Sequence, residues 1–317
     1  MKEGPSFEKI VGNIQEETKE KLINMGKETF NNQAFEELKG LEREKTLEEQ
    51  AIISLANKKT NRIREKYGLD DFDISEKNFH IVKEKKWPRE KDTAFYNQEY
   101  QSVVMEETLS NARFMTMVFH EMLHFKSYNA RQTIDQDDGS KNVYAYRIGL
   151  EVFSRDGKHL RFRNLDEAVI EKMTKKYTSE IFKYPPFKRL KEEMEQTKQL
   201  RKKGGYATTK DGKPLFDEDT FYAEVNKEKN IQVNEFSYKE ERVILNNLID
   251  KIFKRNSDRF KKREEVFEVF EKAMITGSIF PLGKLIDRTF SKGTFRKLGD
   301  FNNEDELEKM KDFVNSL

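Results

Sequence analysis

Hydrophobic residues recur at helical spacing along most of this chain, and they form short β-prone runs in only a few places. Residues 1–70 show the helical spacing, and within them Thr46 and Glu49 stand three apart before an apolar run, as in a capping box. We therefore expect a helix that begins at Leu47 and ends before Gly68. The charge runs of this part are typical of a solvated helix face, and we assign it no chemistry.

Between residues 79 and 105 the pattern changes to short runs rich in β-branched and aromatic residues. Residues 79–82 predict one strand, and residues 92–96 and 101–105 predict two more, separated by a turn-rich spacer. We expect a small sheet with an edge strand that could pair with an extended peptide. His80 lies in the first of these strands, where a core or surface histidine is more common than a metal ligand.

A helix predicted within residues 110–130 is apolar around most of its circumference, in a chain whose mean hydropathy is −0.92. Its apolar positions are Phe114, Met117, Val118, Phe119, Met122, Leu123 and Phe125. Such a helix belongs in a core. It also carries two histidines and a glutamate, and polar groups in a core need partners.

The order His-Glu-Met-Leu-His at residues 120–124 is typical of a metal site. Residues four apart lie on one face of a helix, so the imidazoles of His120 and His124 can reach one metal ion. Glu121 projects about 100° away from His120 and can hold a metal-bound water without being a ligand. The alternative is a chance string on an ordinary amphipathic helix, which is the weaker explanation in a chain with only 4 histidines. Since the chain has no cysteine, any metal site must use histidine and carboxylate ligands.

The segment after this helix predicts a loop and a hairpin. Residues 132–142 are polar and contain several aspartates, but they lack the full pattern of a calcium-binding loop, so we expect an ordinary loop. Residues 144–153 and 159–162 are β-prone and flank an Asp-Gly pair at 156–157. This arrangement is a strong signal for a β-hairpin.

A further helix is predicted to begin near Asn164, with Asn164 or Asp166 as its cap, and to run through Thr174. Glu167 and Glu171 lie four apart on one face of this helix. One of the two carboxylates could complete a tetrahedral metal site, and the other could hold the free ring nitrogen of a histidine ligand. The alternative is two solvated glutamates in a glutamate-rich chain.

The two motifs together, His-Glu-x-x-His at 120–124 and Asp-Glu-x-x-x-Glu at 166–171, resemble those of the gluzincin metallopeptidases. This family is the thermolysin-like branch of the zincins, and the resemblance covers about residues 90–175. It implies one zinc ion with three protein ligands, namely His120, His124 and Glu167.

The same resemblance assigns roles to the residues around the metal. It implies that Glu121 is the general base and that Glu171 orients His120. The edge strand that binds the substrate backbone in this family is matched by Thr93, Ala94 and Phe95. The chain departs from the family at Thr93 and Asp166, where asparagine is usual. The segment between the two motifs is also longer than in thermolysin itself, which indicates a remodelled substrate site.

Residues 183–317 predict a separate helical part of the chain. The sequence Tyr-Pro-Pro at 184–186 interrupts the chain, and residues 187–203 predict a highly charged helix. Residues 204–214 predict a flexible or hairpin-like linker. Apolar residues at helical spacing then predict a helical bundle from Tyr238 onward.

Composition limits the partners that we expect. The 60 basic and 58 acidic residues nearly cancel to a net charge of +2, so we expect no nucleic-acid partner. No stretch approaches about eighteen apolar residues, and the first residues lack the apolar core of a signal peptide. We therefore expect no membrane segment and a cytoplasmic location.

These observations predict an α+β protein whose zincin-like catalytic domain, residues 71–182, lies between a helical segment, 1–70, and a helical domain, 183–317. Its expected activity is zinc-dependent hydrolysis of peptide or protein substrates. Zinc would lower the pKa of its bound water toward about 7, Glu121 would take the proton, and the hydroxide would attack a peptide carbonyl. Gluzincins also use a histidine or a tyrosine to stabilise the oxyanion, and the candidates are His159 and Tyr238.

Two alternatives belong to other classes of protein. A zincin fold with an inactive zinc site could serve as a scaffold or interaction protein, although a purely structural site would not need Glu121. The basic faces of the C-terminal helices could instead contact nucleic acid, which a salt-dependent shift with DNA or RNA would reveal. The glutamates interleaved on these faces favour a solvated surface.

Overall fold

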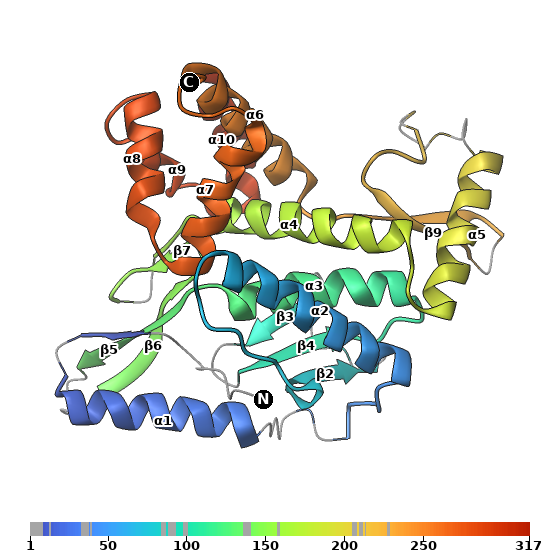
Figure 1. The fold of residues 1–317 in the computed structure, drawn as a ribbon, viewed down its shortest axis with the longest axis horizontal. Helices are drawn as coiled ribbons and strands as arrows, with labels where there is room; N and C mark the ends of the chain where they lie inside the picture. The colour runs from blue at the N-terminus through green and yellow to red at the C-terminus, as the bar shows by residue number, and fades with distance from the viewer. Residues whose placement is uncertain are drawn as a thin grey trace.

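The computed structural model has a mixed α+β fold in which long helices and small sheets surround one buried helix, α3 (Asn111–Lys126) (Figure 1). This confirms the α+β class predicted from the sequence. The residues that the structure describes are 9–12, 14–32, 38, 40–83, 87, 93–97, 101–135, 141–156, 159–204, 208, 212, 214–226 and 229–317.

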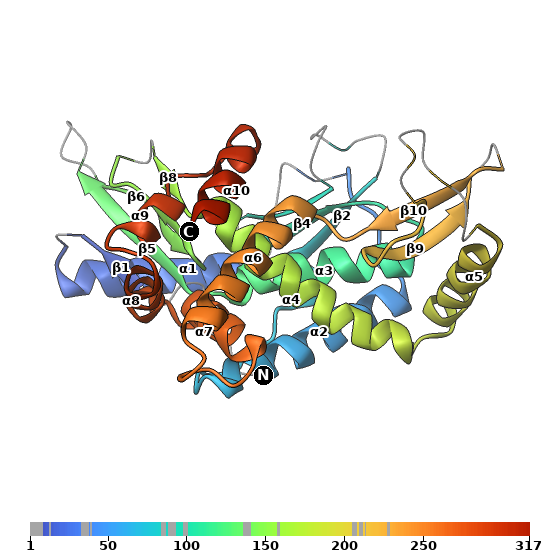
Figure 2. The ribbon, with the colours of Figure 1, turned by 90° about the horizontal axis from the view of Figure 1, so that it is seen from above.

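Helix α3 lies at the centre of the packing. Helix α2 (Leu47–Lys66) packs along one side of α3, and α4 (Arg163–Lys183) packs along another (Figures 1 and 2). The aromatic side chains of Phe114 and Phe119 are fully buried in this contact region. The apolar circumference of the segment therefore predicted correctly that this helix lies in a core.

A three-stranded sheet covers a third side of α3. Its strands, in spatial order, are β2 (Phe79–Val82), β4 (Ser102–Glu106) and β3 (Ala94–Asn97). β4 runs parallel to β2 and antiparallel to β3, so β3 is the edge strand, and it contacts α3. The three predicted strands are confirmed, while residues 98 and 99 of the predicted spacer lie outside the described residues. His80 in β2 is buried, and its Nδ1 lies 2.9 Å from Oε2 of Glu42.

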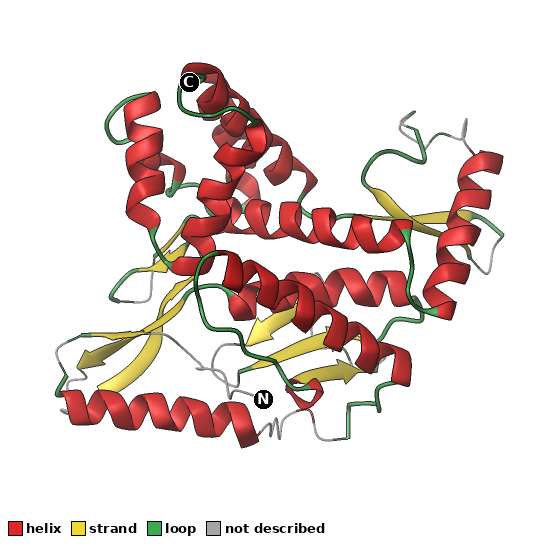
Figure 3. Ribbon diagram, in the orientation of Figure 1, coloured by secondary structure: helices red, strands yellow, loops and turns green. Residues whose placement is uncertain are grey.

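A second sheet corrects the loop predicted for residues 132–142. Its strands, in spatial order, are β1 (Lys9–Val11), β5 (Asn129–Asp135), β6 (Lys141–Ile148), β7 (Glu151–Phe153) and β8 (Leu160–Arg161) (Figure 3). β5 and β6 pair antiparallel along their lengths, and only residues 136–140, which lie outside the described residues, connect them. Polar groups of this segment are satisfied inside the sheet: the buried Gln132 amide donates to the carbonyl oxygens of Ala145 and Ser154 at 3.2 and 2.9 Å.

The hairpin predicted around the Asp-Gly pair is confirmed, because β7 and β8 pair antiparallel. Residues 157 and 158 of its turn lie outside the described residues. The β-prone run predicted for residues 144–153 is divided, however, by a turn at Gly149, whose φ is +56°. A Cβ at this position would lie 2.5 Å from Oδ1 of Asp166, so the backbone conformation and the close approach both require glycine.

Residues 183–317 are not entirely helical, although the sequence predicted a helical domain there. Helix α5 (Lys188–Gly204) follows the predicted break, but a hairpin of β9 (Thr220–Val225) and β10 (Ile231–Glu235) then packs against α5 (Figure 2). The first four residues of β9 are all buried, so the strand shows no alternation of apolar and polar residues that would reveal it. Most of the linker predicted for residues 204–214 lies outside the described residues.

The predicted helical bundle is present above α4 (Figure 1). Its helices are α6 (Lys239–Arg255), α7 (Arg263–Thr276), α8 (Ile279–Thr289), α9 (Thr294–Leu298) and α10 (Leu307–Ser316). Two large hydrophobic cores hold the fold together, and each contains residues from all three predicted parts of the chain. The division at residues 70 and 182 stays a prediction. In the described part of the chain no helix has the length and apolar character needed to cross a membrane.

The two predicted helix caps have different outcomes. The capping box at Thr46 is confirmed at the start of α2. The cap predicted for α4 at Asn164 or Asp166 is wrong, because α4 begins after Phe162, which has a left-handed conformation and no side-chain cap. The Asp166 carboxylate instead accepts a hydrogen bond from the backbone N–H of Leu150 at 2.6 Å. A contact with a distant turn has thus replaced the local cap.

The N-terminus of α3 is capped by its own N-cap residue and by a residue of another helix. The Ser110 hydroxyl accepts from the N–H of Arg113 at 3.2 Å. Glu193 on α5 accepts from the N–H groups of Asn111 and Ala112, at 2.9 and 2.8 Å. A carboxylate there satisfies donors that the helix cannot, and it is also favoured by the helix dipole. Helix α5 therefore determines where the central helix begins.

We expect the Glu193→Ala substitution to lower the free energy of unfolding by about 1–3 kcal/mol, because it leaves two buried N–H groups without an acceptor. Urea or thermal unfolding followed by circular dichroism measures the change. The matched control is Glu192→Ala, which removes an exposed carboxylate from the same helix and should have little effect. Equal effects of the two substitutions would contradict the capping role.

Candidate metal centre

Two imidazoles of α3 and one carboxylate of α4 converge on one point. The Nε2 atoms of His120 and His124 lie 3.2 Å apart, and Oε2 of Glu167 lies 3.3 Å from the first and 3.4 Å from the second. A tetrahedron with metal–ligand bonds of about 2.0–2.1 Å has edges of about 3.3–3.4 Å. The three donor atoms therefore have the spacing of three corners of a tetrahedral metal site.

This group could hold a metal ion, and no other group of three histidine or acidic side chains in the described part of the chain has donor atoms within 4.8 Å of one another. Glu167 is 8% exposed, and its buried Oε2 forms no hydrogen bond of good geometry with a described residue, although the two imidazole nitrogens lie 3.3 and 3.4 Å away. A buried carboxylate oxygen without a partner is costly. A cation at the centre of the three donors would satisfy it, so the donor set fits a metal.

Electrostatics at the centre favour a positive charge. Burial lowers the pKa of His120, but contacts with Glu167 and Glu171 together raise it by more, so the pKa lies well above its usual value. Burial alone would raise the pKa of Glu167, yet the charge of His124 and contacts with both imidazoles hold that pKa well below its usual value. In the protein alone this stabilised charge is a proton, and a metal cation can take its place.

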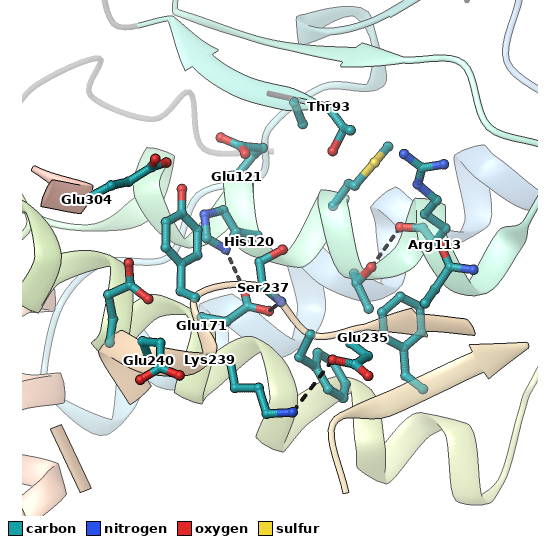
Figure 4. Close-up of a pocket in the computed structure, with 18 of the residues that line it drawn as sticks. Thr93, Arg113, His120, Glu121, Glu171, Glu235, Ser237, Lys239, Glu240 and Glu304 are labelled. Atoms are coloured by element: carbon teal, nitrogen blue, oxygen red, sulfur yellow. Dashed lines mark hydrogen bonds and ion pairs between the residues drawn. The ribbon is translucent and has the colours of Figure 1, made fainter. Parts of the chain in front are cut away.

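Glu171 contacts His120, as its predicted orienting role requires. Its Oε2 lies 2.7 Å from Nδ1 of His120, while its Oε1 accepts from the backbone N–H of Ser237 at 2.8 Å (Figure 4). A proton on Nδ1 is favoured by this contact, which leaves the lone pair of Nε2 directed at the centre. The same carboxylate therefore holds a candidate ligand and a backbone segment between β10 and α6.

Asp166 is a site residue that the sequence analysis assigned to another role. Its Oδ2 is buried without a hydrogen-bond partner among the described residues and lies 3.6 Å from Nδ1 of His124. Burial raises the pKa of Asp166 and of the neighbouring Glu151. The sequence signal for this placement was that Asp166 directly precedes Glu167 on α4. The Asp166 carboxylate therefore lies beside the metal group, on the side that faces the turn at Gly149.

Glu121 lies beside the three donors but is not one of them. It is 6% exposed and lines the pocket next to the centre, where Figure 4 shows it near Thr93 of the edge-strand segment. Burial raises the pKa of Glu121, and the positive charges of His120 and His124 oppose the rise. Glu121 therefore lies at the pocket outside the donor group, and its role as the general base stays a prediction.

The two candidates for the oxyanion-stabilising residue lie in different places. The Tyr238 ring stacks on the His120 ring, with the centroids 5.6 Å apart and an interplanar angle of 9°, and it lines the pocket. His159 is exposed beside the turn of the β7–β8 hairpin, where its backbone N–H donates to the Ser154 hydroxyl, and it does not line the pocket. The structure therefore brings only Tyr238 to the site.

The predicted substrate-binding strand contributes one face to the site. Thr93 and Ala94 line the pocket, whereas the Phe95 side chain packs on the opposite face of the sheet, against Val82 and Val104. Successive side chains of a strand point to opposite faces, so Ala94 and Phe95 cannot both face α3. Phe95 can therefore contribute to the pocket side of the strand only through its backbone.

The pocket beside the metal group has a volume of about 800 Å³. One wall consists of α3 and the start of β3, and the other consists of residues of β10, of the start of α6 and of the segment 236–238 between them (Figure 4). Residues of the C-terminal part therefore form more than half of the lining of this pocket. Tyr238 was the only candidate among them from the sequence, because no local motif marks the others.

Comparisons of the chain with known protein families, curated proteins and solved structures found no match.

We expect about one metal ion per chain, and the His124→Ala variant should lose tight binding because it removes one of three donors. Metal analysis of both proteins after dialysis against a weak chelator measures this. His80→Ala is the matched control, since His80 lies outside the group, and it should keep the metal. A full equivalent of metal in His124→Ala would show that the ligand assignment is wrong.

We expect the Glu171→Gln variant to bind the metal more weakly, by roughly ten- to a hundredfold, as for other carboxylates that orient histidine ligands. The amide can still accept from Ser237, but it holds His120 less strongly than a carboxylate does. A competition titration with a chromogenic chelator gives the affinity. Unchanged affinity would contradict the orienting role.

Proposed function

We propose that this chain is a zinc-dependent peptidase of the gluzincin type with a zincin-like catalytic fold. The observation that carries the proposal is the position of Glu121, a buried carboxylate outside the donor set, at the wall of a pocket beside the three donors. A metal site that only stabilised the fold would need no base at an open pocket. The arrangement of α3 between the edge strand β3 and the glutamate-bearing helix α4 supports the zincin-like fold.

The donor set supports zinc as the metal. Two imidazole nitrogens and one carboxylate oxygen match the protein ligands of catalytic zinc sites, which keep one further position for water or substrate. When bound, zinc would make water more acidic and polarise a carbonyl group. The residues of the chain would then bind the peptide, move the proton and stabilise the developing charge.

Glu121 would move the proton. Its carboxylate would accept a proton from the attacking water and then give it to the nitrogen of the leaving amine. This role needs a carboxylate within reach of the centre that is not itself a ligand, and Glu121 follows His120 directly on α3. The Glu121 side chain is buried except where it lines the pocket, so a substrate would reach it through the pocket.

Tyr238 would stabilise the oxyanion that develops on the attacked carbonyl. Its ring is held against His120, and its hydroxyl forms no hydrogen bond with another described residue, so it is available to a substrate. Burial raises the pKa of Tyr238, which keeps the hydroxyl protonated and able to donate.

The edge strand β3 would bind the substrate backbone. The carbonyl oxygen of Thr93 accepts from the N–H of Glu106 at 2.8 Å, so Thr93 pairs with the neighbouring strand β4. Backbone groups of alternate residues point to opposite sides of an antiparallel strand, so those of Ala94 face away from β4. An extended peptide could add to this edge, beside the pocket that Ala94 lines.

We expect the Glu121→Gln variant to fold and keep its zinc, yet to hydrolyse peptides at least roughly a hundredfold more slowly, because an amide cannot accept the proton. Cleavage of a peptide library by wild type and variant, at equal zinc occupancy, measures this. The Glu192→Gln variant, which removes an exposed carboxylate of α5 outside the pocket, is the control and should cleave as the wild type does.

Equal cleavage by wild type and Glu121→Gln would mean that another base, or a contaminant, is responsible. If neither protein cleaved any peptide of a broad library with zinc bound, the second candidate would be favoured. This candidate is an inactive zinc-binding scaffold on the same fold.

A further inference from the structure

One end of the pocket carries more negative charge than the metal centre uses. Glu240, Glu241 and Glu304 line this end. In Figure 4, Glu240 and Glu304 lie on one side of His120, whereas Arg113 lies on the other side. The pocket therefore has an acidic end beside the metal group.

The cations of the pocket wall do not neutralise this end, because each is paired elsewhere. Arg113 lies 3.7 Å from Glu106. The Lys239 ammonium pairs with Asp217 and lies 3.7 Å from Glu235. No other lysine or arginine lines the described pocket. Glu240 at this end lies 3.9 Å from Lys311, which does not line the pocket, whereas Glu241 faces the pocket without an ion pair in the described chain.

Glu241 is the most unusual of these carboxylates. It is 8% exposed, and it forms no ion pair and no hydrogen bond with another residue of the described chain. Burial raises the pKa of Glu241, a hydrogen bond from its own backbone N–H lowers that pKa, and the charges of Glu167, Glu240 and Glu304 raise it. The N-terminal position on α6 favours a carboxylate through the helix dipole, but a buried charge also needs a direct partner. A ligand with a positive charge would provide one.

We propose that Glu241, together with Glu240 and Glu304, forms a subsite for the side chain of a lysine or arginine in the peptide substrate. The inference rests on the proposed peptidase function and names its substrate class. The cationic head would pair with the buried Glu241 carboxylate, and the aliphatic stem could pack against Leu307, which also lines the pocket.

The spacing of the carboxylates favours an organic cation over a second metal ion. In the described chain, only His120, His124 and Glu167 bring three donor atoms within 4.8 Å of one another. Glu240, Glu241 and Glu304 are therefore too far apart to share one metal ion. An ammonium or guanidinium group at the end of a long side chain needs no such close cluster.

The experiment uses peptides that are blocked at both ends, so that one side chain is the only cation. Members of the set carry lysine, arginine, norleucine or glutamine at one position, and the position is moved along the peptide. At the position that reaches the subsite, zinc-loaded wild type should cleave lysine and arginine peptides at least about tenfold better than norleucine peptides. Glu241→Gln should lose most of this preference, and Glu192→Gln, which removes an exposed carboxylate of α5 outside the pocket, should keep it. A preference unaffected by Glu241→Gln would overturn the proposal.

A binding measurement separates this inference from the peptidase proposal. Zinc-loaded Glu121→Gln protein, titrated calorimetrically, should bind the lysine peptide at least about tenfold more tightly than the norleucine peptide. The double variant Glu121→Gln/Glu241→Gln should bind the two alike. A lysine preference without any cleavage by wild type would support the subsite and remove the peptidase. Cleavage without a lysine preference in either measurement would support the peptidase and overturn the subsite.

Thermal unfolding of Glu241→Gln should show no loss of stability, because the substitution removes a repelled charge.

Discussion

The convergence of three donor atoms depends on how closely α3 approaches α4. Leu123 and Ala168 are buried in one hydrophobic core, and they are chain neighbours of the candidate ligands His124 and Glu167. The side chains that determine the separation of the helices are therefore adjacent to those that converge on the centre. Packed helices have nearly fixed separations, whereas a shift of about 1 Å is enough to spoil a site of this kind. The core thus preserves the geometry of the donors.

Helix α3 is held at both ends by residues far away in the sequence. At its start, Glu193 of α5 accepts the N–H groups of Asn111 and Ala112. At its end, the carbonyl oxygen of Lys126 accepts a hydrogen bond from Arg64 of α2 at 2.7 Å. A helix fixed in this way cannot slide along its axis without breaking buried hydrogen bonds. The histidines therefore have a defined height relative to the sheet and to α4.

The sequence contained the parts of this fold that follow from local periodicity. The buried helix with His120 and Glu121, the three strands of the first sheet and the C-terminal bundle all follow from the spacing of apolar residues. The remainder depends on contacts between distant segments. Gln132 lies in a strand because distant carbonyl groups satisfy its amide, and Asp166 contacts the turn before β7 instead of capping its own helix. The wall that carries Glu241 reaches the site only because the C-terminal part packs there, and no sequence motif predicts that packing.

The Glu171 carboxylate has a consequence for thermodynamic coupling. One of its oxygens holds His120 and the other holds the N–H of Ser237, so a single rigid group joins the candidate metal centre to the far wall of the pocket. Whatever moves that wall also changes the orientation of a ligand, and whatever orders the ligand also orders the wall. Such linkage is reciprocal: if metal binding strengthens peptide binding by some factor, peptide binding must strengthen metal retention by the same factor.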